Sequence, residues 1–264
     1  LDAVKQGTAD IGVCFTGFFP GQFPLTGVVE LPMTGIFNAE QGTNVLWDLY
    51  EQTPEFQAEL SDYQVLMMYT NPNNCIGTSS PVYTADDMKG LKLRVPAGTC
   101  ADMATAWGAT PMTITSAEIY QSMEKDVIQG YIIDPTGVNA WSLYEVTDYY
   151  TWMPFCVSPW LVLMNKDSWN KIPADLQEIV LSCSDRERSL GMSAISEEEA
   201  NETFEKAKNE YNGTVIEPDD EQYATFETAA EEYRAQWIET QSANGFDAQA
   251  FVDKCLELAP KYEK

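Results

Sequence analysis

Short apolar runs alternate with longer amphipathic segments along most of the chain. The apolar runs are rich in β-branched residues and predict strands at Ile11–Phe15, Tyr63–Tyr69, Leu91–Val95, Gly130–Ile133 and Leu161–Met164. The segments between them place apolar residues at helical spacing and predict helices over Gln41–Tyr50, Pro54–Leu60, Cys100–Trp107 and Ala117–Glu124. Strands that alternate with helices in this way indicate an α/β architecture.

The last part of the chain is predominantly helical. From Ala174 to Tyr211 there is no proline and a single glycine, Gly191. The pattern predicts either two helices broken near Gly191 or one helix long enough to bridge two lobes. A short strand at Thr214–Ile216 and helices over Asp219–Thr240 and Ala248–Leu258 are expected to follow.

The first residues have the pattern of a helix end. Leu1–Gln6 is helical in character, and Gly7 is suited to stop the helix before the first predicted strand. Leu1 is not a methionine, and no charged and apolar leader precedes the helix. We therefore expect the sequence to open within the fold, after a first strand and helix and any export signal.

Charge and composition restrict the classes of partner. The 264 residues include 41 acidic and 15 basic ones, which gives a net charge of −26. This charge repels phosphate backbones and argues against nucleic acids and anionic membrane surfaces. The longest apolar run, Trp160–Met164, is far shorter than the roughly 20 residues that cross a bilayer. Fourteen acids against three bases between Glu197 and Glu239 indicate a solvated helix face or, alternatively, a docking surface.

The sequence offers little for catalysis. Histidine is absent, which removes Ser-His and Cys-His nucleophiles and imidazole metal ligands. The six cysteines contain no C-x-x-C pair, and their spacing leaves disulfides and free thiols open. Asp134, Glu118 and Glu30 are candidate catalytic carboxylates, but they form no pair at a telling spacing, and no nucleotide-binding glycine motif is present. We expect no enzyme, no cofactor and no metal.

Arg94 is the most informative single residue, because it is the only arginine before Arg186. The two-residue period of its strand places it with Lys92 on the face opposite Leu93, and Pro96 ends the strand directly afterwards. Ligands of open α/β sheets bind beyond the carboxyl ends of strands, and a planar guanidinium can hold a carboxylate through two parallel hydrogen bonds. The period alone leaves a carboxylate-binding arginine and a solvent-facing arginine equally open.

Aromatic residues gather in two stretches. One runs from Phe15 to Phe23 after a predicted strand, and the other from Tyr149 to Phe155 before a predicted strand, with Trp160 close behind. Such residues pack inside lobes or line a mostly apolar ligand cleft. The pattern does not choose between these two interpretations.

A set of short motifs follows in order along residues 7–177. The motifs are Gly7–Gly12, Pro20–Leu25 with Glu30–Pro32, Asp87–Pro96, Trp107–Pro111, Glu118–Tyr120, Met164–Trp169 and Ile172–Gln177. Together they resemble the solute-binding proteins of tripartite ATP-independent periplasmic (TRAP) transporters, the DctP-like family. The chain departs from that family's pattern at Gln129, where aspartate is common, and at Asn74, where some sugar-acid-binding branches carry a second arginine.

The resemblance implies an α/β, two-lobed, periplasmic-binding-protein-like fold with crossing hinge strands and a long bridging helix. Residues 1–72 and 160–200 would form lobe one, and residues 73–159 and 201–264 lobe two. The implied function is capture of a small organic acid in the periplasm or another extracytoplasmic space, with or without a lipid anchor, and its delivery to integral membrane subunits of the transporter. A ligand-sensing module and an enzyme on the same scaffold are the alternatives.

The resemblance also assigns the site. Arg94 matches the family's K-x-R-x-P arginine and is expected to bind the ligand carboxylate. The remaining candidates are Phe15, Phe18, Tyr69, Phe155 and Trp160 as apolar walls and Thr16, Asn71, Asp134 and Thr136 as polar contacts. Because Asn74 replaces a second arginine, a second carboxylate would be buried without a cation. We therefore expect the ligand to be a monocarboxylate with an apolar or aromatic body. Separately, we expect the protein to be a monomer.

Overall fold

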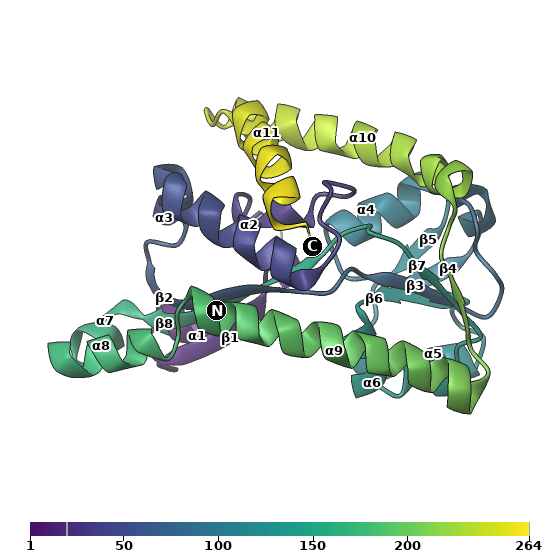
Figure 1. Cartoon of the computed structure of the whole chain (residues 1–264), viewed down its shortest axis with the longest axis horizontal. Coiled ribbons are helices and arrows are strands. Elements are labelled where there is room, and N and C mark those ends of the chain that lie inside the picture. The colour runs from purple at the N-terminus through teal and green to yellow at the C-terminus, as the bar shows by residue number, and fades with distance from the viewer. Residues whose placement is uncertain (20, 264) are drawn as a thin grey trace.

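The structure is a computed structural model that describes residues 1–19 and 21–263. Two β-sheets, each flanked by helices, lie side by side along the long axis of the molecule (Figure 1). The first sheet is antiparallel and has the order β1 (Ile11–Phe15), β8 (Ser158–Asn165), β2 (Tyr63–Asn71). Its central strand, β8, therefore pairs with both others.

The second sheet is mixed. Its order is β5 (Thr110–Met112), β4 (Lys92–Arg94), β6 (Gly130–Ile133), β3 (Cys75–Thr78), β7 (Tyr149–Trp152), β9 (Thr214–Ile216). Strand β4 runs parallel to both β5 and β6, so the carboxyl ends of these three strands meet at one edge of the sheet. The predicted α/β class and the predicted strands are confirmed. Strands β3 and β5 were not predicted because they are short and carry glycine or proline, and β7 was interpreted only as part of an aromatic cluster.

Helices cover both sheets. Those near the first sheet are α1 (Asp2–Lys5), α2 (Ala39–Gln52), α3 (Pro54–Glu59), α7 (Lys166–Asn170), α8 (Ala174–Ser182) and α11 (Ala248–Leu258), and those near the second are α4 (Thr99–Ala106), α5 (Ile119–Glu124) and α6 (Pro135–Ala140). Short 3-10 turns occur at η1 (Thr16–Phe18), η2 (Thr26–Glu30), η3 (Ala85–Met88), η4 (Ser116–Glu118), η5 (Leu143–Glu145) and η6 (Ala259–Tyr262). None of the helices within residues 1–19 and 21–263 has the length and apolarity needed to cross a membrane.

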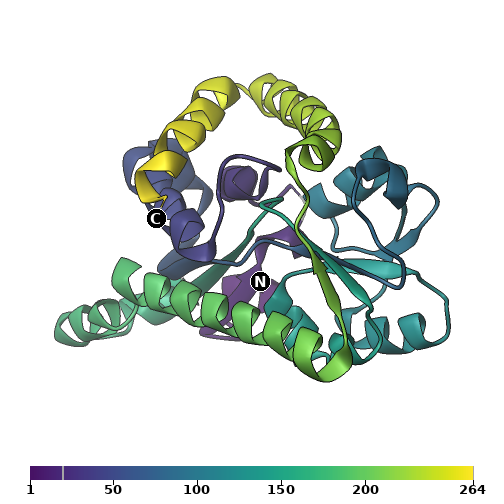
Figure 2. The same ribbon diagram turned by 45° about the vertical axis from the view of Figure 1, so that its right-hand side comes forward.

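The last helix packs with the first sheet. Phe251 and Leu258 of α11 lie in the same hydrophobic cluster as Leu49 of α2 and Leu161 of β8. The long helix α10 (Asp220–Ala243) carries the chain back from the second lobe to this position, on the side of the molecule opposite α9 (Arg186–Tyr211) (Figures 1 and 2). The assignment of all of residues 201–264 to lobe two is therefore corrected for α11, whose apolar face completes the first core.

Two extended connections cross between the lobes. One joins β2 to β3 and the other joins β7 to β8. They lie side by side, because Asn71 pairs with Ser158 in the first sheet and the Asn74 N–H donates to the Cys156 carbonyl at 2.9 Å. The paired strands that enter and leave this crossing are the crossing hinge strands that the resemblance implied.

The region between Ala174 and Tyr211 holds two helices, with a break that differs from the predicted one. Helix α8 ends at Ser182, and α9 begins at Arg186, where the Asp185 carboxylate accepts the Arg188 N–H at 2.9 Å. Gly191 lies inside α9 and interrupts nothing. Aspartate is a strong N-cap, so it begins a new helix more effectively than one glycine breaks an existing one.

Helix α9 bridges the lobes, as expected. Its 26 residues correspond to a length of about 39 Å. Near its start, the Ser193 hydroxyl lies 2.6 Å from that of Thr43 and donates to the Thr70 carbonyl of β2 at 3.0 Å. Further along, Glu199 accepts a hydrogen bond from Asn139 of α6, at 2.8 Å.

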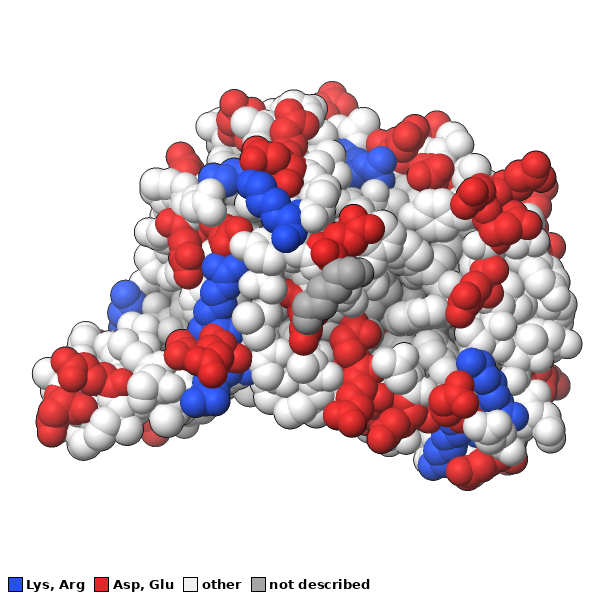
Figure 3. Space-filling model, viewed as in Figure 1, with Lys and Arg blue, Asp and Glu red and all other residues white. Residues whose placement is uncertain are grey.

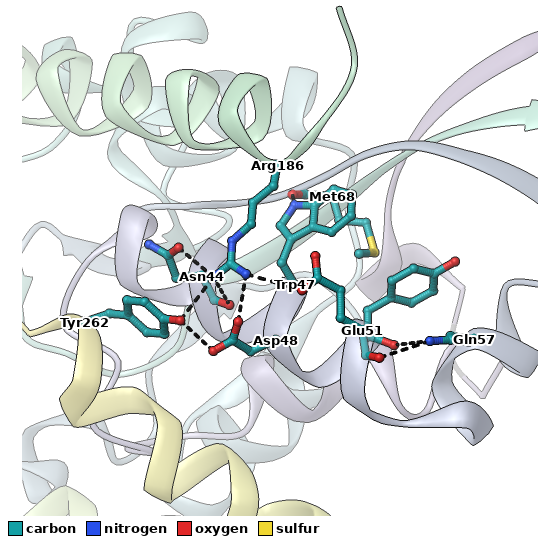
Figure 4. Close-up of polar contacts among 9 residues, drawn as sticks. Asn44, Trp47, Asp48, Glu51, Gln57, Met68, Arg186 and Tyr262 are labelled. Carbon is teal, nitrogen blue, oxygen red and sulfur yellow. Dashed lines mark hydrogen bonds and ion pairs between the residues drawn. The ribbon is translucent and has the colours of Figure 1, made fainter. Parts of the chain in front are cut away.

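A polar network fastens the first turn of α9 to lobe one (Figure 4). Arg186 forms an ion pair with Asp48 of α2 at 2.7 Å and donates to the Asn44 side-chain oxygen at 2.9 Å. Tyr262 donates to the other carboxylate oxygen of Asp48 and accepts from Arg186 at 3.2 Å. The network joins α2, α9 and η6, so the bridging helix is anchored firmly at this end.

Candidate ligand-binding site

A cavity of about 320 Å³ lies between the lobes, beside the crossing connections. One wall comes from β1, η1 and the crossing strands, and consists of Phe15, Phe18, Asn71, Asn74, Ser158 and Trp160. The other wall comes from the second lobe, and consists of Arg94, Pro96, Ser116, Ile133, Asp134, Thr136, Gly137, Ala140 and Trp141. Both lobes therefore contribute to a single site.

Arg94 is the only cation among the lining residues. It is the last residue of β4, and only 4% of it is exposed. Its guanidinium donates to the Ser116 hydroxyl at 2.9 Å, to the Ile114 carbonyl at 3.3 Å and to the Ile132 carbonyl at 3.5 Å. These partners are all neutral and occupy three of the five N–H donors of an arginine.

No carboxylate of the described residues forms an ion pair with Arg94. None of the ion pairs within residues 1–19 and 21–263 includes this residue. Burial lowers the pKa of Arg94, while nearby groups that include Asp134 oppose the shift. An arginine stays protonated in proteins even so. A buried guanidinium with free donors and neutral partners is suited to bind an anion.

Asp134 brings an opposite charge to the same edge of the sheet. It follows β6 and caps α6, where its carboxylate accepts from the Thr136 hydroxyl, the Thr136 N–H at 3.1 Å and the Gly137 N–H at 3.3 Å. Burial raises the pKa of Asp134, and the hydrogen bonds from Thr136, Gly137 and Asn71 oppose the rise. The carboxylate is thus held by its own helix rather than by Arg94.

Aromatic rings build the wall opposite Arg94's lobe. Trp160 lies on the central strand β8, with Phe15 and Tyr69 as its direct neighbours on β1 and β2. Its ring lies 5.7 Å from that of Phe15 and is stacked on that of Tyr69 at 6.4 Å between centroids. Phe18 packs edge-on against Phe15 at 5.1 Å. Cross-strand stacking of this kind gives a broad apolar surface.

The structure brings most of the predicted site residues together. Those that line the cavity are Arg94, Phe15, Phe18, Asn71, Asp134, Thr136 and Trp160. Tyr69 lies behind them and supports Trp160. The Thr16 hydroxyl donates to the Pro159 carbonyl at 3.3 Å, and Thr16 lines a neighbouring pocket of about 250 Å³ instead.

Phe155 is a correction. Only 1% of it is exposed, and its ring lies 4.9 Å from that of Trp107 in the core of the second lobe. The expectation that Phe155 walls the ligand cavity is therefore wrong. Phe155 packs instead against the aromatic ring of Trp107 at the end of α4, inside the core of the second lobe.

The sequence analysis did not propose several of the cavity-lining residues as ligand contacts. Asn74 had been noted only as a departure from a family pattern, yet its amide donates to the Cys156 carbonyl at 3.0 Å and the Ser158 hydroxyl at 3.2 Å beside the cavity. Ser116 lies in a turn after β5 and reaches Arg94 only through the tertiary fold. The signal available for Asn74 in the sequence was its match to the position where some branches of the family carry a second arginine.

The three candidate catalytic carboxylates do not meet. Asp134 lines the cavity, Glu30 lines the neighbouring pocket, and the exposed Glu118 caps its own 3-10 turn by accepting from the Thr115 hydroxyl at 2.7 Å. In the described part of the chain, no group of three or more cysteine or acidic side chains could hold a metal ion.

Two α/β lobes that share a cavity at their crossing strands are typical of solute-binding proteins. The chain belongs to the DctP family, bacterial extracellular solute-binding protein family 7, whose sequence model matches residues 1–241. The predicted family and two-lobed fold are confirmed.

Solved structures with the same fold cover the whole of this chain. One is a TRAP periplasmic solute-binding protein of Desulfovibrio salexigens, with 28% identity, coverage of 99% of this chain and 81% of that one, and a TM-score of 0.87. Another is a TRAP solute-binding protein from a marine metagenome, described as specific for aromatic acid ligands and solved with metahydroxyphenylacetate, with 25% identity, 100% and 83% coverage, and a TM-score of 0.91.

Curated relatives match a shorter stretch. A solute-binding protein of a Sulfitobacter strain is 26% identical over 62% of this chain and 48% of its own length. The ectoine/5-hydroxyectoine-binding periplasmic protein of Ruegeria pomeroyi is 28% identical over 69% of this chain and 54% of its own length. The chain thus spans about half the length of the curated relatives it matches.

Proposed function

We propose that the protein captures an aromatic monocarboxylate outside the cytoplasm and delivers it to a TRAP-type membrane transporter. The observation that carries the proposal is Arg94, a buried guanidinium with free donors in a cavity between two lobes. A ligand carboxylate would supply the counter-charge that the protein itself withholds from this arginine. Charge-assisted bonds of this kind are among the stronger contacts in binding sites.

The proposal for a single carboxylate follows from the rest of the lining. Arg94 is the only cation there, and Asp134 lies at the same edge of the sheet. A second carboxylate would be desolvated close to Asp134 without a partner of its own, which costs several kcal/mol. A hydroxyl or an N–H group of the ligand would instead donate to Asp134.

The proposal for an aromatic body follows from Phe15, Phe18 and Trp160, whose rings form one wall of the cavity. The volume of about 320 Å³ is at the lower end of small-molecule sites and suits a ligand with one ring. The marine metagenome protein described as specific for aromatic acids shares the fold over the whole of this chain, which supports the same ligand class.

Delivery to membrane subunits is proposed from the family, whose members in the solved structures are TRAP solute-binding proteins. Acidic side chains are spread widely over the face shown in Figure 3, and basic ones lie among them in a few groups. We propose that this acidic surface provides the docking contacts. A gene neighbourhood that lacks any multi-span membrane protein would count against delivery.

Isothermal titration calorimetry tests the ligand class. The purified chain would be titrated with phenylacetate, 3-hydroxyphenylacetate and benzoate, and in parallel with succinate and a sugar acid. We expect the aryl acids to bind most tightly and, in thermal melts at equal ligand concentration, to raise the melting temperature most. A preference for succinate or the sugar acid would overturn the proposed pocket chemistry, and the absence of binding by every carboxylate would overturn the role of Arg94.

A further inference from the structure

Two buried thiols meet behind the ligand cavity. Cys100 lies in the first turn of α4, and Cys156 lies in the crossing connection between β7 and β8. Their sulfur atoms are 3.6 Å apart, and the two residues are 0% and 3% exposed. This is the one thiol-to-thiol hydrogen-bond contact in the described part of the chain.

The pair adjoins the residues that shape the site. The Asn74 side-chain amide donates to the backbone carbonyl of Cys156 at 3.0 Å. The same amide nitrogen lies 3.4 Å from the Cys156 sulfur. Cys100 follows the strand end that carries Arg94, after a short connection through Gly98. A link between the two sulfurs would join the start of α4 to the crossing connection, directly behind the wall of the cavity.

We propose that Cys100 and Cys156 form a disulfide in the mature protein. The sulfurs of a disulfide are about 2 Å apart, so those of Cys100 and Cys156 must approach by about 1.6 Å to form the bond. Bacterial extracytoplasmic compartments favour disulfides. The inference rests on the proposed function only for this compartment.

The chemistry is thiol–disulfide exchange with a disulfide-bearing oxidant of the compartment. One cysteine thiolate attacks the oxidant's disulfide, so that a mixed disulfide forms and one oxidant thiol is released. The second cysteine thiolate then displaces the other oxidant sulfur. The protein loses two protons and two electrons, and the oxidant becomes a dithiol. Because both residues are buried in the folded chain, the exchange takes place during folding, before the second lobe is fully formed.

Counting thiols tests the proposal. The chain would be produced in an oxidising compartment, unfolded in the presence of iodoacetamide without a reductant, and analysed by mass spectrometry. Of its six cysteines, we expect Cys14, Cys75, Cys183 and Cys255 to be alkylated, and peptides containing Cys100 and Cys156 to be recovered linked. Alkylation of all the cysteines, or a link between any other pair, would overturn the proposal.

Matched variants separate the link from nonspecific oxidation. Cys183 is exposed, unlike both members of the pair, so C183S should keep the link. C100S and C156S should lose it and melt on the order of 5–10 °C lower than the wild type without reductant. Reduction should remove most of this difference, and a difference that persists after reduction would contradict the link. If neither variant folds, the thiol count of the wild type still decides.

The result is independent of the ligand proposal. A chain that binds an aryl acid but carries six free thiols would overturn the disulfide alone. A linked chain that binds no carboxylate would overturn the proposed function alone.

Discussion

Arg94 and Asp134 stand at the carboxyl ends of the adjacent parallel strands β4 and β6, and both line the cavity between the lobes. No ion pair joins them in the described structure. Asp134 is held instead by the first amides of α6, whose helix end favours a negative charge. In the proposed site, this arrangement would leave the arginine available to a ligand carboxylate, and Asp134 would disfavour a second negative charge.

The role of Arg94 predicts a strong effect of its replacement. Arg94→Lys keeps the positive charge but loses the planar fork, and Arg94→Ala loses both. We expect affinity for an aryl acid to fall by about 1.5–3 kcal/mol in Arg94→Lys, and further in Arg94→Ala, as measured by calorimetry. Lys92→Ala is the matched control, because Lys92 lies on the same strand but is exposed. Unchanged affinity in both arginine variants would show that the carboxylate binds elsewhere.

The role of Asp134 predicts a change of selectivity. Asp134→Asn retains an N-cap for α6, since asparagine caps helices about as well as aspartate does. It removes the negative charge from the cavity. We expect succinate to gain affinity relative to phenylacetate by about tenfold or more, because its second carboxylate no longer meets a buried like charge. The ratio of the two dissociation constants measures this effect, and an unchanged ratio would contradict it.

Trp160 predicts how the ring of the ligand is recognised. Trp160→Leu keeps an apolar side chain on β8 but removes the aromatic face, whereas Trp160→Phe keeps an aromatic ring. We expect Trp160→Leu to weaken phenylacetate binding by on the order of 1 kcal/mol, and Trp160→Phe to weaken it less. An aliphatic monocarboxylate serves as the reference ligand. If its binding weakens equally in Trp160→Leu, the residue supports the cavity without contacting a ligand ring.

The sequence predicted those features that local patterns encode. Strands β1 and β6 were located with their observed ends, and Arg94 was placed at a strand end, because alternation and Pro96 specify these positions locally. Phe155 was misplaced because an aromatic residue near a strand end satisfies a core and a cavity equally well. The presence of Trp107 beside it decides between them, and that contact is tertiary.

The missed parts of the site depend on distant contacts. Ser116 reaches Arg94 across 22 positions of sequence, and Asn74 meets Ser158 across 84. The turn that carries Ser116 and the crossing connection that carries Asn74 have no periodic pattern in the sequence. The packing of α11 on the first core was missed for the same reason, since its apolar face is equally suited to either lobe.

The two-sided cavity predicts that the lobes close on a ligand. Groups from both lobes line it, so a ligand that contacts both favours the closed arrangement by its differential affinity. The crossing connections at residues 72–74 and 153–157 would absorb the rotation. We expect small-angle scattering to give a smaller radius of gyration at saturating aryl acid. Arg94→Ala at the same ligand concentration should show no change, and equal radii for the wild type would contradict closure.

Glu30 predicts a dependence of stability on pH that is unrelated to the ligand. It ends η2, is 5% exposed, and has one carboxyl oxygen without a hydrogen-bond partner in the described structure. Burial raises its pKa from 4.5 to about 8. The folded chain therefore binds this proton more tightly than the unfolded chain does. The stabilisation is complete below pH 4.5 and is lost as the pH rises to about 8.

Glu30→Gln should remove this slope, because glutamine resembles the protonated acid but cannot ionise. We expect its free energy of unfolding in urea to rise relative to the wild type by up to about 1.4 kcal/mol per pH unit between about pH 5 and 8, and to level off above. The groups that interact with Glu30 are Cys100 and Tyr233. Cys100 carries no charge in the proposed disulfide, and as a free thiol its pKa is raised by its contact with Cys156; burial raises the pKa of Tyr233 to about 12. Neither ionises across this range, so the difference in slope between Glu30→Gln and the wild type reports Glu30. Other buried carboxyls with raised pKa values, such as Asp102 in the same pocket, contribute equally to both proteins. The exposed Glu178 provides the control, since Glu178→Gln should follow the wild type at every pH. A constant difference between Glu30→Gln and the wild type from pH 5 to 9 would mean that Glu30 is already ionised in the folded protein.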